Sequence, residues 1–261
     1  MGGELSGSID ESIHHAVTKL AHLHFTATEE AKNRVIRMVE NPKYVLNVGC
    51  PRIDVVKDII SNPLEEIDIL ELEELGVGSK INFKERFAII SMHPVTTSEK
   101  IVAIDQVIID ILEQGLQIIC LWPNADSGSL KISKSIRRLR ESGRISQQNI
   151  RFYKNLPIHI YVKLMDRCSV LAGNSSSGIR EGAFIGTPSI NIGSRQEYRE
   201  RGYNVIDIKE YNKPNFESAL AKQLNQKKYA QSNLYGDGNA SGRMVETIFS
   251  IKPPIQKQFS E

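Results

Sequence analysis

The chain has 261 residues, of which 40% are hydrophobic and 25% charged, and its formal net charge is +2. A nearly balanced charge without a long Lys/Arg block argues against a nucleic-acid-binding protein. No apolar run approaches the ~20 residues of a membrane span, and the N-terminus lacks a signal-peptide pattern, so we expect a soluble cytoplasmic protein. The odd set of cysteines, without metal-ligand spacing, favours reduced, buried thiols and no metal site: Cys50, Cys120 and Cys168.

The first 60 residues contain few predicted elements. Ile13, Val17 and Leu20 recur at helical spacing and predict a helix that begins near Asp10 and includes His22 and His24. A second helix is predicted over residues 29–40, a short strand over 44–48 and a helix or linker over 54–61. These elements are too few to form a complete sheet. The segment therefore either packs on the surface of a larger domain or is the end of a domain whose beginning is absent.

The charged, weakly periodic residues 61–85 are interpreted as a linker. Beyond them, short apolar runs alternate with amphipathic helical segments, as in residues 99–114 and 129–140. Such alternation predicts βαβ units and a doubly wound α/β domain with a parallel sheet over residues 86–261, ending in a C-terminal helix. The predicted strands cover residues 87–91, 116–121, 150–153, 169–172, 189–192 and 204–207.

A run of small residues joins one predicted strand to the helix start that follows it. Small residues let a ligand approach the backbone, and the free amides and positive dipole at a helix N-terminus suit a phosphate. The serine hydroxyls add donors. The alternative is that Asn174 and Ser175 only cap the helix. The run comprises Gly173, Asn174, Ser175, Ser176, Ser177 and Gly178.

Two charged residues sharpen this prediction. Glu181 lies close to the small-residue run, where a carboxylate would repel a diphosphate unless it binds something else, and one carboxylate can accept from both ribose hydroxyls. The next predicted strand ends near Arg195, and parallel strands end on the same crevice. Arg195 can there supply charge to a phosphate, although an ordinary surface arginine is the alternative.

These segments resemble the hydrolysing UDP-N-acetylglucosamine 2-epimerases. The longest match is GNSSSGIREGAFIGTPSINIGSRQ, residues 173–196. The remaining blocks fall in family order across nearly the whole chain: GGELSGSIDES (2–12), SMHPVTT (91–97), PNADSGS (123–129) and YGDGNA (235–240).

The resemblance implies a glycosyltransferase-B-like fold, with one complete Rossmann-like domain and the end of a second, residues 1–60, around a cleft. It implies conversion of UDP-GlcNAc and water to ManNAc and UDP, through elimination of UDP and hydration of a glycal, in sialic-acid-type synthesis and without a cofactor. The UDP ligands that it implies are Asn124, Asn174, Ser175, Ser176, Ser177, Gly178, Glu181 and Arg195. The implied catalytic residues are Asp10, Glu4, His93, Glu11 and His14.

The residues allow plainer interpretations of the catalytic set. Asp10 alone reads as a helix N-cap, and His93 before Pro94 as an ordinary loop histidine. The family usually has arginine at the position of His14. Arginine is always charged and can donate two parallel hydrogen bonds to one partner, whereas histidine does neither reliably. Family members also carry roughly a hundred or more residues before the Gly2-Gly3-Glu4 block, so we expect an N-terminally truncated chain.

Three alternatives remain open at this stage. The substrate could be UDP-N,N′-diacetylbacillosamine, because the sugar pocket draws on the region before Met1. The chain could be a non-catalytic UDP-sugar-binding subunit or remnant, or a glycosyltransferase of the same fold. The expected assemblies are a homo-oligomer or a complex with a partner chain that supplies the missing N-terminal half.

Overall fold

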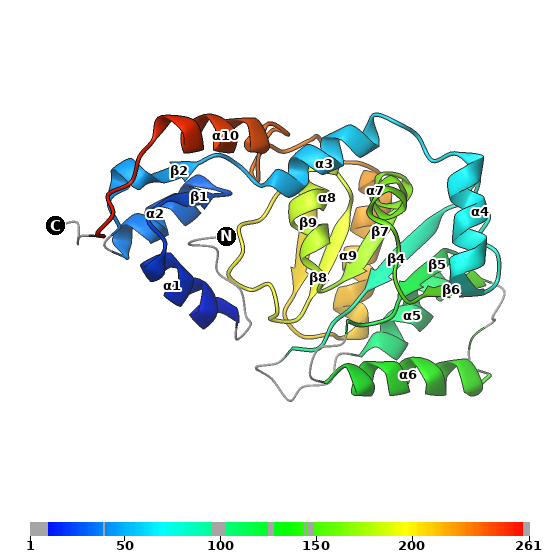
Figure 1. Cartoon of the computed structure of the whole chain (residues 1–261). Coiled ribbons are helices and arrows are strands. Elements are labelled where there is room, and N and C mark those ends of the chain that lie inside the picture. The colour runs from blue at the N-terminus through cyan, green and yellow to red at the C-terminus, as the bar shows by residue number, and fades with distance from the viewer. Residues whose placement is uncertain are drawn as a thin grey trace.

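The computed structural model describes residues 10–38, 40–95, 103–124, 128–143, 145 and 149–257. Its main body is a seven-stranded sheet in the order β3-β6-β5-β4-β7-β8-β9 (Figure 1). All neighbouring strands are parallel except β3, which runs antiparallel to β6. The expected doubly wound α/β sheet is therefore confirmed. The strands are β3 (Gly76–Gly78), β4 (Phe87–Ser91), β5 (Gln117–Leu121), β6 (Ile150–Tyr153), β7 (Val170–Gly173), β8 (Ser189–Ile192) and β9 (Val205–Ile208).

The sheet is buried on both faces, which is why its strands read as continuous apolar runs. Ala88 and Ile90 of β4 face one core, and Phe87 and Ile89 face the other. The first core is covered by α5 (Ile104–Glu113), α6 (Ser129–Glu141) and α9 (Lys213–Gln226). The second is covered by α3 (Pro51–Ile60), α4 (Glu66–Leu75), α7 (Ile158–Arg167) and α8 (Arg180–Ile185). The result is a three-layer arrangement.

The N-terminal segment forms a separate two-stranded parallel sheet. It contains α1 (Asp10–Leu20), β1 (His24–Thr26), α2 (Glu29–Arg37), a short 3-10 helix (Pro42–Tyr44) and β2 (Val45–Asn47). The expectation that His22 and His24 lie on the first helix was wrong. The helix ends at Leu20, and His24 pairs with Val45 across the small sheet.

Residues 61–85, expected to be a linker, contain ordered structure. Leu72 of α4 is buried in the second core, and β3 is the edge strand of the main sheet. Arg151 of β6 fixes this edge by donating to the backbone carbonyls of Glu73, Gly76 and Gly78. Helix α3 is likewise part of the main domain, because its Ile53 and Val56 are buried in the second core. The domain bounds at 1–60, 61–85 and 86–261 stay a prediction.

The C-terminal helix α10 (Ala240–Ser250) packs on α3 and leads the chain back to the N-terminal segment (Figure 1). Asp54 of α3 accepts hydrogen bonds from the backbone amides of Ala240 and Ser241, at 2.9 and 2.7 Å. Burial alone would raise the pKa of the Asp54 carboxyl, but these hydrogen bonds outweigh it and hold the pKa below its ordinary value. Asp54 thereby caps α10.

A buried carboxylate ties the C-terminal segment to α1. Glu40 is 2% exposed and pairs with Lys19 at 2.9 Å, His24 at 3.1 Å and Lys257 at 2.6 Å. Lys257 also donates to the backbone carbonyls of Thr18 and Ala21. Burial acts to raise the pKa of Glu40, but the hydrogen bonds from Lys257 and Lys19 leave it lowered.

We expect Glu40→Gln to lower the free energy of unfolding by roughly 2–3 kcal/mol, because two ammonium groups lose their carboxylate. Urea denaturation followed by circular dichroism measures this change. The matched control is Glu141→Gln at the exposed end of α6, for which we expect a change within about 0.5 kcal/mol. Equal stabilities of the two variants would contradict the role of Glu40.

Stability should also fall on acidification. Burial lowers the pKa of His24 below 6.5, so folding opposes its protonation and stability is lost as the pH falls below 6.5. The pKa of Glu40 lies below 4.5, so its contribution is lost further into acid. We expect His24→Gln to flatten the first decline in a pH series of urea denaturations and to leave the second in place.

Candidate functional site

The centre of the sheet contains a topological switch point. From β4 the chain moves to β5 and β6 on one side, whereas β7, β8 and β9 follow on the other. Ligands of open α/β sheets bind beyond the carboxyl ends of the strands at such a point. His93 follows β4 there, and the small-residue run 173–178, called the serine loop below, follows β7.

Gly173 brings the ends of β4 and β7 into close contact. Its φ is 144°, and a Cβ added there would lie 2.0 Å from the carbonyl oxygen of Ser91. The next amide, of Asn174, donates to the same oxygen at 3.1 Å. Only glycine fits this position, so the start of the serine loop is fixed against β4.

Asn174 joins the serine loop to His93. The side chain is fully buried, with its Oδ1 accepting from the His93 amide at 2.7 Å and its Nδ2 donating to the His93 carbonyl at 2.8 Å. The backbone carbonyl of Asn174 accepts from Gln196 at 3.0 Å and from Arg195 at 3.3 Å. Asn174, which the sequence suggested as a UDP ligand, therefore uses its side chain to position His93.

Ser175, Ser176 and Ser177 form a tight turn ahead of α8. Ser175 caps the 3-10 helix Ser176–Gly178 by accepting from the Ser177 amide, and Arg180 donates to the Ser176 hydroxyl at 3.3 Å. Ser175 and Ser176 are half-buried, whereas Ser177 is buried. Two hydroxyls and a guanidinium therefore lie at the mouth of this turn, a set of donors suited to an anion.

Glu181 is buried just behind this turn. Its side chain lies 3.8 Å from the Arg52 guanidinium and 4.0 Å from that of Arg180. Its Oε2 is shielded from solvent and accepts no hydrogen bond from the described residues. A buried carboxylate oxygen without a donor has unused capacity to accept hydrogen bonds, for example from sugar hydroxyls.

His93 is 8% exposed, and the described contacts specify its tautomer. Its Nδ1 accepts from the Asn124 amide at 3.3 Å, and its Nε2 lies 3.4 Å from the Ser91 hydroxyl. A neutral imidazole that accepts at Nδ1 carries its proton on Nε2. Asn124, expected to bind UDP, contacts His93 through its backbone and has an exposed side chain.

The other candidate catalytic residues belong to the N-terminal segment. Glu4 lies outside the described residues, and of Asp10 only the backbone, at the start of α1, is described. Glu11 lies 3.8 Å from His15 on the same helix. The half-buried His14 lines an apolar pocket of about 370 Å³ with Val17 and Phe25. Their catalytic roles stay predictions. No cluster of metal-ligating side chains occurs among the described residues, and none of their helices is long and apolar enough to cross a membrane.

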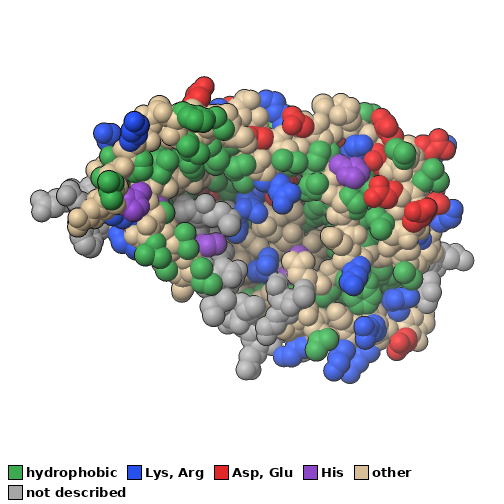
Figure 2. All heavy atoms as spheres, in the orientation of Figure 1, with side chains coloured by type: hydrophobic (Ala, Val, Ile, Leu, Met, Phe, Trp, Pro, Cys, Tyr) green, Lys and Arg blue, Asp and Glu red, His purple; other side chains and the backbone are tan. Residues whose placement is uncertain are grey.

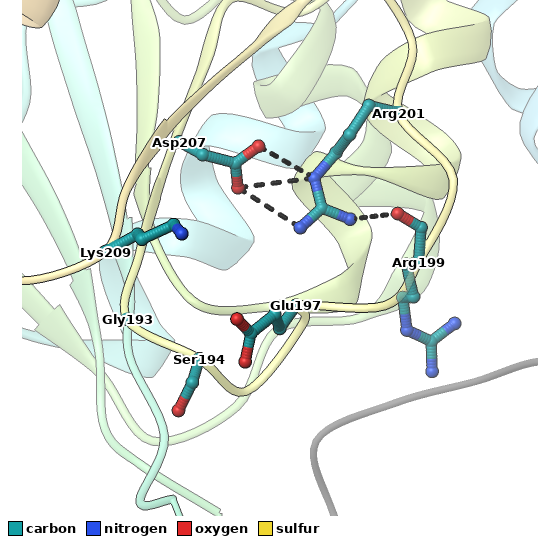
Figure 3. A pocket seen from close by; sticks show the side chains of 7 residues that line it. All are labelled: Gly193, Ser194, Glu197, Arg199, Arg201, Asp207 and Lys209. Carbon is teal, nitrogen blue, oxygen red and sulfur yellow. Dashed lines mark hydrogen bonds and ion pairs between the residues drawn. The ribbon is translucent and has the colours of Figure 1, made fainter.

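A side pocket of about 220 Å³ lies next to the segment that carries Arg195 and Gln196. Figure 3 shows Arg201 among its lining residues, paired with Asp207 and donating to the Arg199 carbonyl. Arg201 also donates to the Gln196 carbonyl at 2.6 Å. Asp207 accepts in turn from Asn191 of β8. This network anchors the segment to β8 and β9. Figure 2 shows basic side chains gathered around a hollow in the middle of the molecule.

Residues 1–249 match the family model described as UDP-N-acetylglucosamine 2-epimerase. The chain belongs to this epimerase family. It is 35% identical over 259 residues to the UDP-N,N′-diacetylbacillosamine 2-epimerase (hydrolyzing) of Legionella pneumophila, covering 98% of the chain and 64% of the relative. It is 31% identical over 252 residues to the UDP-N-acetylglucosamine 2-epimerase of Neisseria meningitidis, covering 95% and 63%. The chain thus spans less than two thirds of these relatives.

Solved structures of the same family share the fold. The chain matches the UDP-GlcNAc 2-epimerase of Neisseria meningitidis bound to UDP-GlcNAc with a TM-score of 0.72 at 18% identity, covering 93% of this chain and 65% of the other. It matches the Methanocaldococcus jannaschii UDP-GlcNAc 2-epimerase in complex with UDP-GlcNAc and UDP with a TM-score of 0.68 at 17% identity, covering 95% and 67%. The glycosyltransferase-B-like fold expected from the sequence is confirmed.

Several residues of this candidate site carry no local sequence signal. Arg52 reaches Glu181 from α3, and Tyr161 reaches Ser177 from α7. Both come from segments distant from the serine loop in sequence, so no spacing pattern points to them. Gln196 and Arg180 could have been found, because each lies within the matched segment 173–196.

We expect Gly173→Ala to destabilise this family member by about 3 kcal/mol or more, because the added methyl group collides with the Ser91 carbonyl at a positive φ. The control is Gly242→Ala in α10, where a Cβ meets nothing within 4 Å. That change should be neutral or stabilising by up to about 1 kcal/mol. Thermal unfolding of both variants measures the difference in their stability. Similar melting temperatures would contradict the prediction, because they would show that β4 and β7 can move apart at little cost.

Proposed function

We propose that this chain binds UDP at the serine loop and carries the nucleotide-binding part of a hydrolysing UDP-N-acetylhexosamine 2-epimerase. The observation that carries the proposal is the buried Glu181, whose Oε2 lacks a donor in the described structure, directly behind a turn of serine hydroxyls. In this assignment the carboxylate accepts from the ribose hydroxyls. Ser175, Ser176, the loop amides and Arg195 contact the diphosphate.

The chemistry of the reaction fits this arrangement. The proton on sugar C2 becomes acidic only when the bond from C1 to the diphosphate oxygen lengthens and the ring gains positive character. Donors around the departing diphosphate therefore lower the barrier for removal of that proton. A carboxylate or histidine then takes it, which yields a glycal to which water adds. His93 lies beside the serine loop, and its tautomer presents an Nε2–H, so it fits the role of donor better than that of base.

The proton-accepting role is proposed for Asp10, with Glu4 and Glu11 as the further acidic candidates. His14 stands where the family usually has arginine, so its contribution to the sugar site is weaker in this proposal. The proposal also includes a place in sialic-acid-type sugar synthesis, a cytoplasmic location, and a homo-oligomer or partner chain.

The substrate that we propose is UDP-GlcNAc, and the alternative substrate is UDP-N,N′-diacetylbacillosamine. The names of the relatives support both, because 35% and 31% identity lie close together. A non-catalytic UDP-sugar-binding subunit is the second alternative, and it requires the same serine loop. Incubating the chain with each UDP-sugar and following free UDP and the released sugar by NMR separates hydrolysing epimerisation from binding alone.

The nucleotide site makes two different predictions for calorimetric binding. Ser175→Ala should weaken UDP about tenfold and leave uridine unchanged, because the serine contacts phosphate. Glu181→Gln should weaken UDP and uridine alike by about tenfold, because the carboxylate contacts ribose.

The matched control is Glu217→Gln on α9, in the opposite layer, where neither ligand should be affected. Binding of UDP that is unchanged in both site variants would overturn the assignment, as would an absence of UDP binding by the unaltered chain.

A further inference from the structure

Tyr161 of α7 is half-buried beside the serine loop, and it has no role in the proposed reaction. Its hydroxyl lies 2.8 Å from the Ser177 hydroxyl, which lies 2.9 Å from the Ser175 hydroxyl. Ser177 is 7% exposed, and Ser175 lies half-exposed at the mouth of the loop. Three hydroxyl groups therefore form a chain from the protein interior to the proposed diphosphate site.

Among the described residues, Ser177 is the hydrogen-bond partner of the Tyr161 hydroxyl. The backbone amide of Ser177 also donates to the Ser175 hydroxyl at 3.4 Å, so backbone and side chain both join the two serines. Tyr161 is thus the inner end of this chain of hydroxyls.

The proton of the Tyr161 hydroxyl sets the direction of this chain. Burial raises the pKa of Tyr161, so the phenol keeps its proton throughout the neutral range and needs an acceptor for it. Ser177 is that acceptor, and Ser177 in turn donates to Ser175. The Ser175 hydroxyl receives this bond and keeps its own proton for an outside acceptor.

We propose that Tyr161 is a positioning residue that orients the hydroxyls of Ser177 and Ser175 so that Ser175 donates to an anionic diphosphate oxygen. The inference rests on the proposed UDP site. Without Tyr161, Ser177 gains no inward donor, and Ser175 can turn its proton inward and its lone pairs toward the ligand. Lone pairs repel a phosphate oxygen, whereas a hydroxyl proton attracts it. Aligned hydroxyls also strengthen one another.

A double-mutant cycle in the complete chain tests this role. Tyr161→Phe should weaken UDP about tenfold, as measured by isothermal titration calorimetry, and leave uridine unchanged. In a Ser175→Ala background, Tyr161→Phe should change UDP affinity by less than about twofold, because the group through which it acts is gone. A merely structural role would weaken both backgrounds equally, and that result would overturn the proposal.

The matched control is Tyr229→Phe, which removes a tyrosine hydroxyl that donates to Gln223 at 2.8 Å in the same sheet domain. Its UDP affinity should equal that of the unaltered chain. Should Tyr161→Phe fail to fold, Ser177→Ala breaks the next link and should give the same tenfold loss. Unchanged UDP binding by Ser177→Ala would then overturn the proposal.

The calorimetric results keep this inference apart from the proposed UDP site. If the unaltered chain binds no UDP, the UDP site itself is refuted. If the unaltered chain binds UDP and folded Tyr161→Phe binds it as tightly, only the positioning role of Tyr161 is refuted.

Discussion

The contact between the ends of β4 and β7 is the constraint on which the site depends. Gly173 allows the Ser91 carbonyl to approach, and Asn174 then holds both backbone groups of His93. Because these bonds are buried and paired, they hold the two loops against each other. The arrangement brings together the end of one half of the sheet and the beginning of the other. Ligand sites of open α/β sheets form at such a junction.

Residues from one helical layer and from the segment after β8 contact this junction. Gln196 and Arg195 reach the Asn174 carbonyl from beyond β8, and Arg201 anchors their segment to Asp207. From the other face, α3 and α7 bring Arg52 and Tyr161 to the same turn. The C-terminal helix α10 is capped by Asp54, so α3 is itself held by the end of the chain. The site is thus assembled from elements far apart in sequence.

The sequence predicted the sheet well because its strands are buried on both faces and read as unbroken apolar runs. The serine loop was found through its small residues and its match to the epimerase family. The sequence missed β1 and β3, each of three residues, because strands this short have no periodicity. The role of Asn174 in holding His93, and the contacts of Arg52 and Tyr161, depend on long-range packing that no local pattern records.

We propose that the serine loop holds a nucleoside diphosphate, with Glu181 at its ribose. A crystal structure of this chain soaked with UDP tests this assignment most directly. We expect diphosphate oxygens within hydrogen-bonding distance of the Ser175 and Ser176 hydroxyls, and ribose hydroxyls on the Glu181 carboxylate. A UDP molecule seated in the side pocket between Arg199 and Lys209, with the serine loop empty, would contradict it.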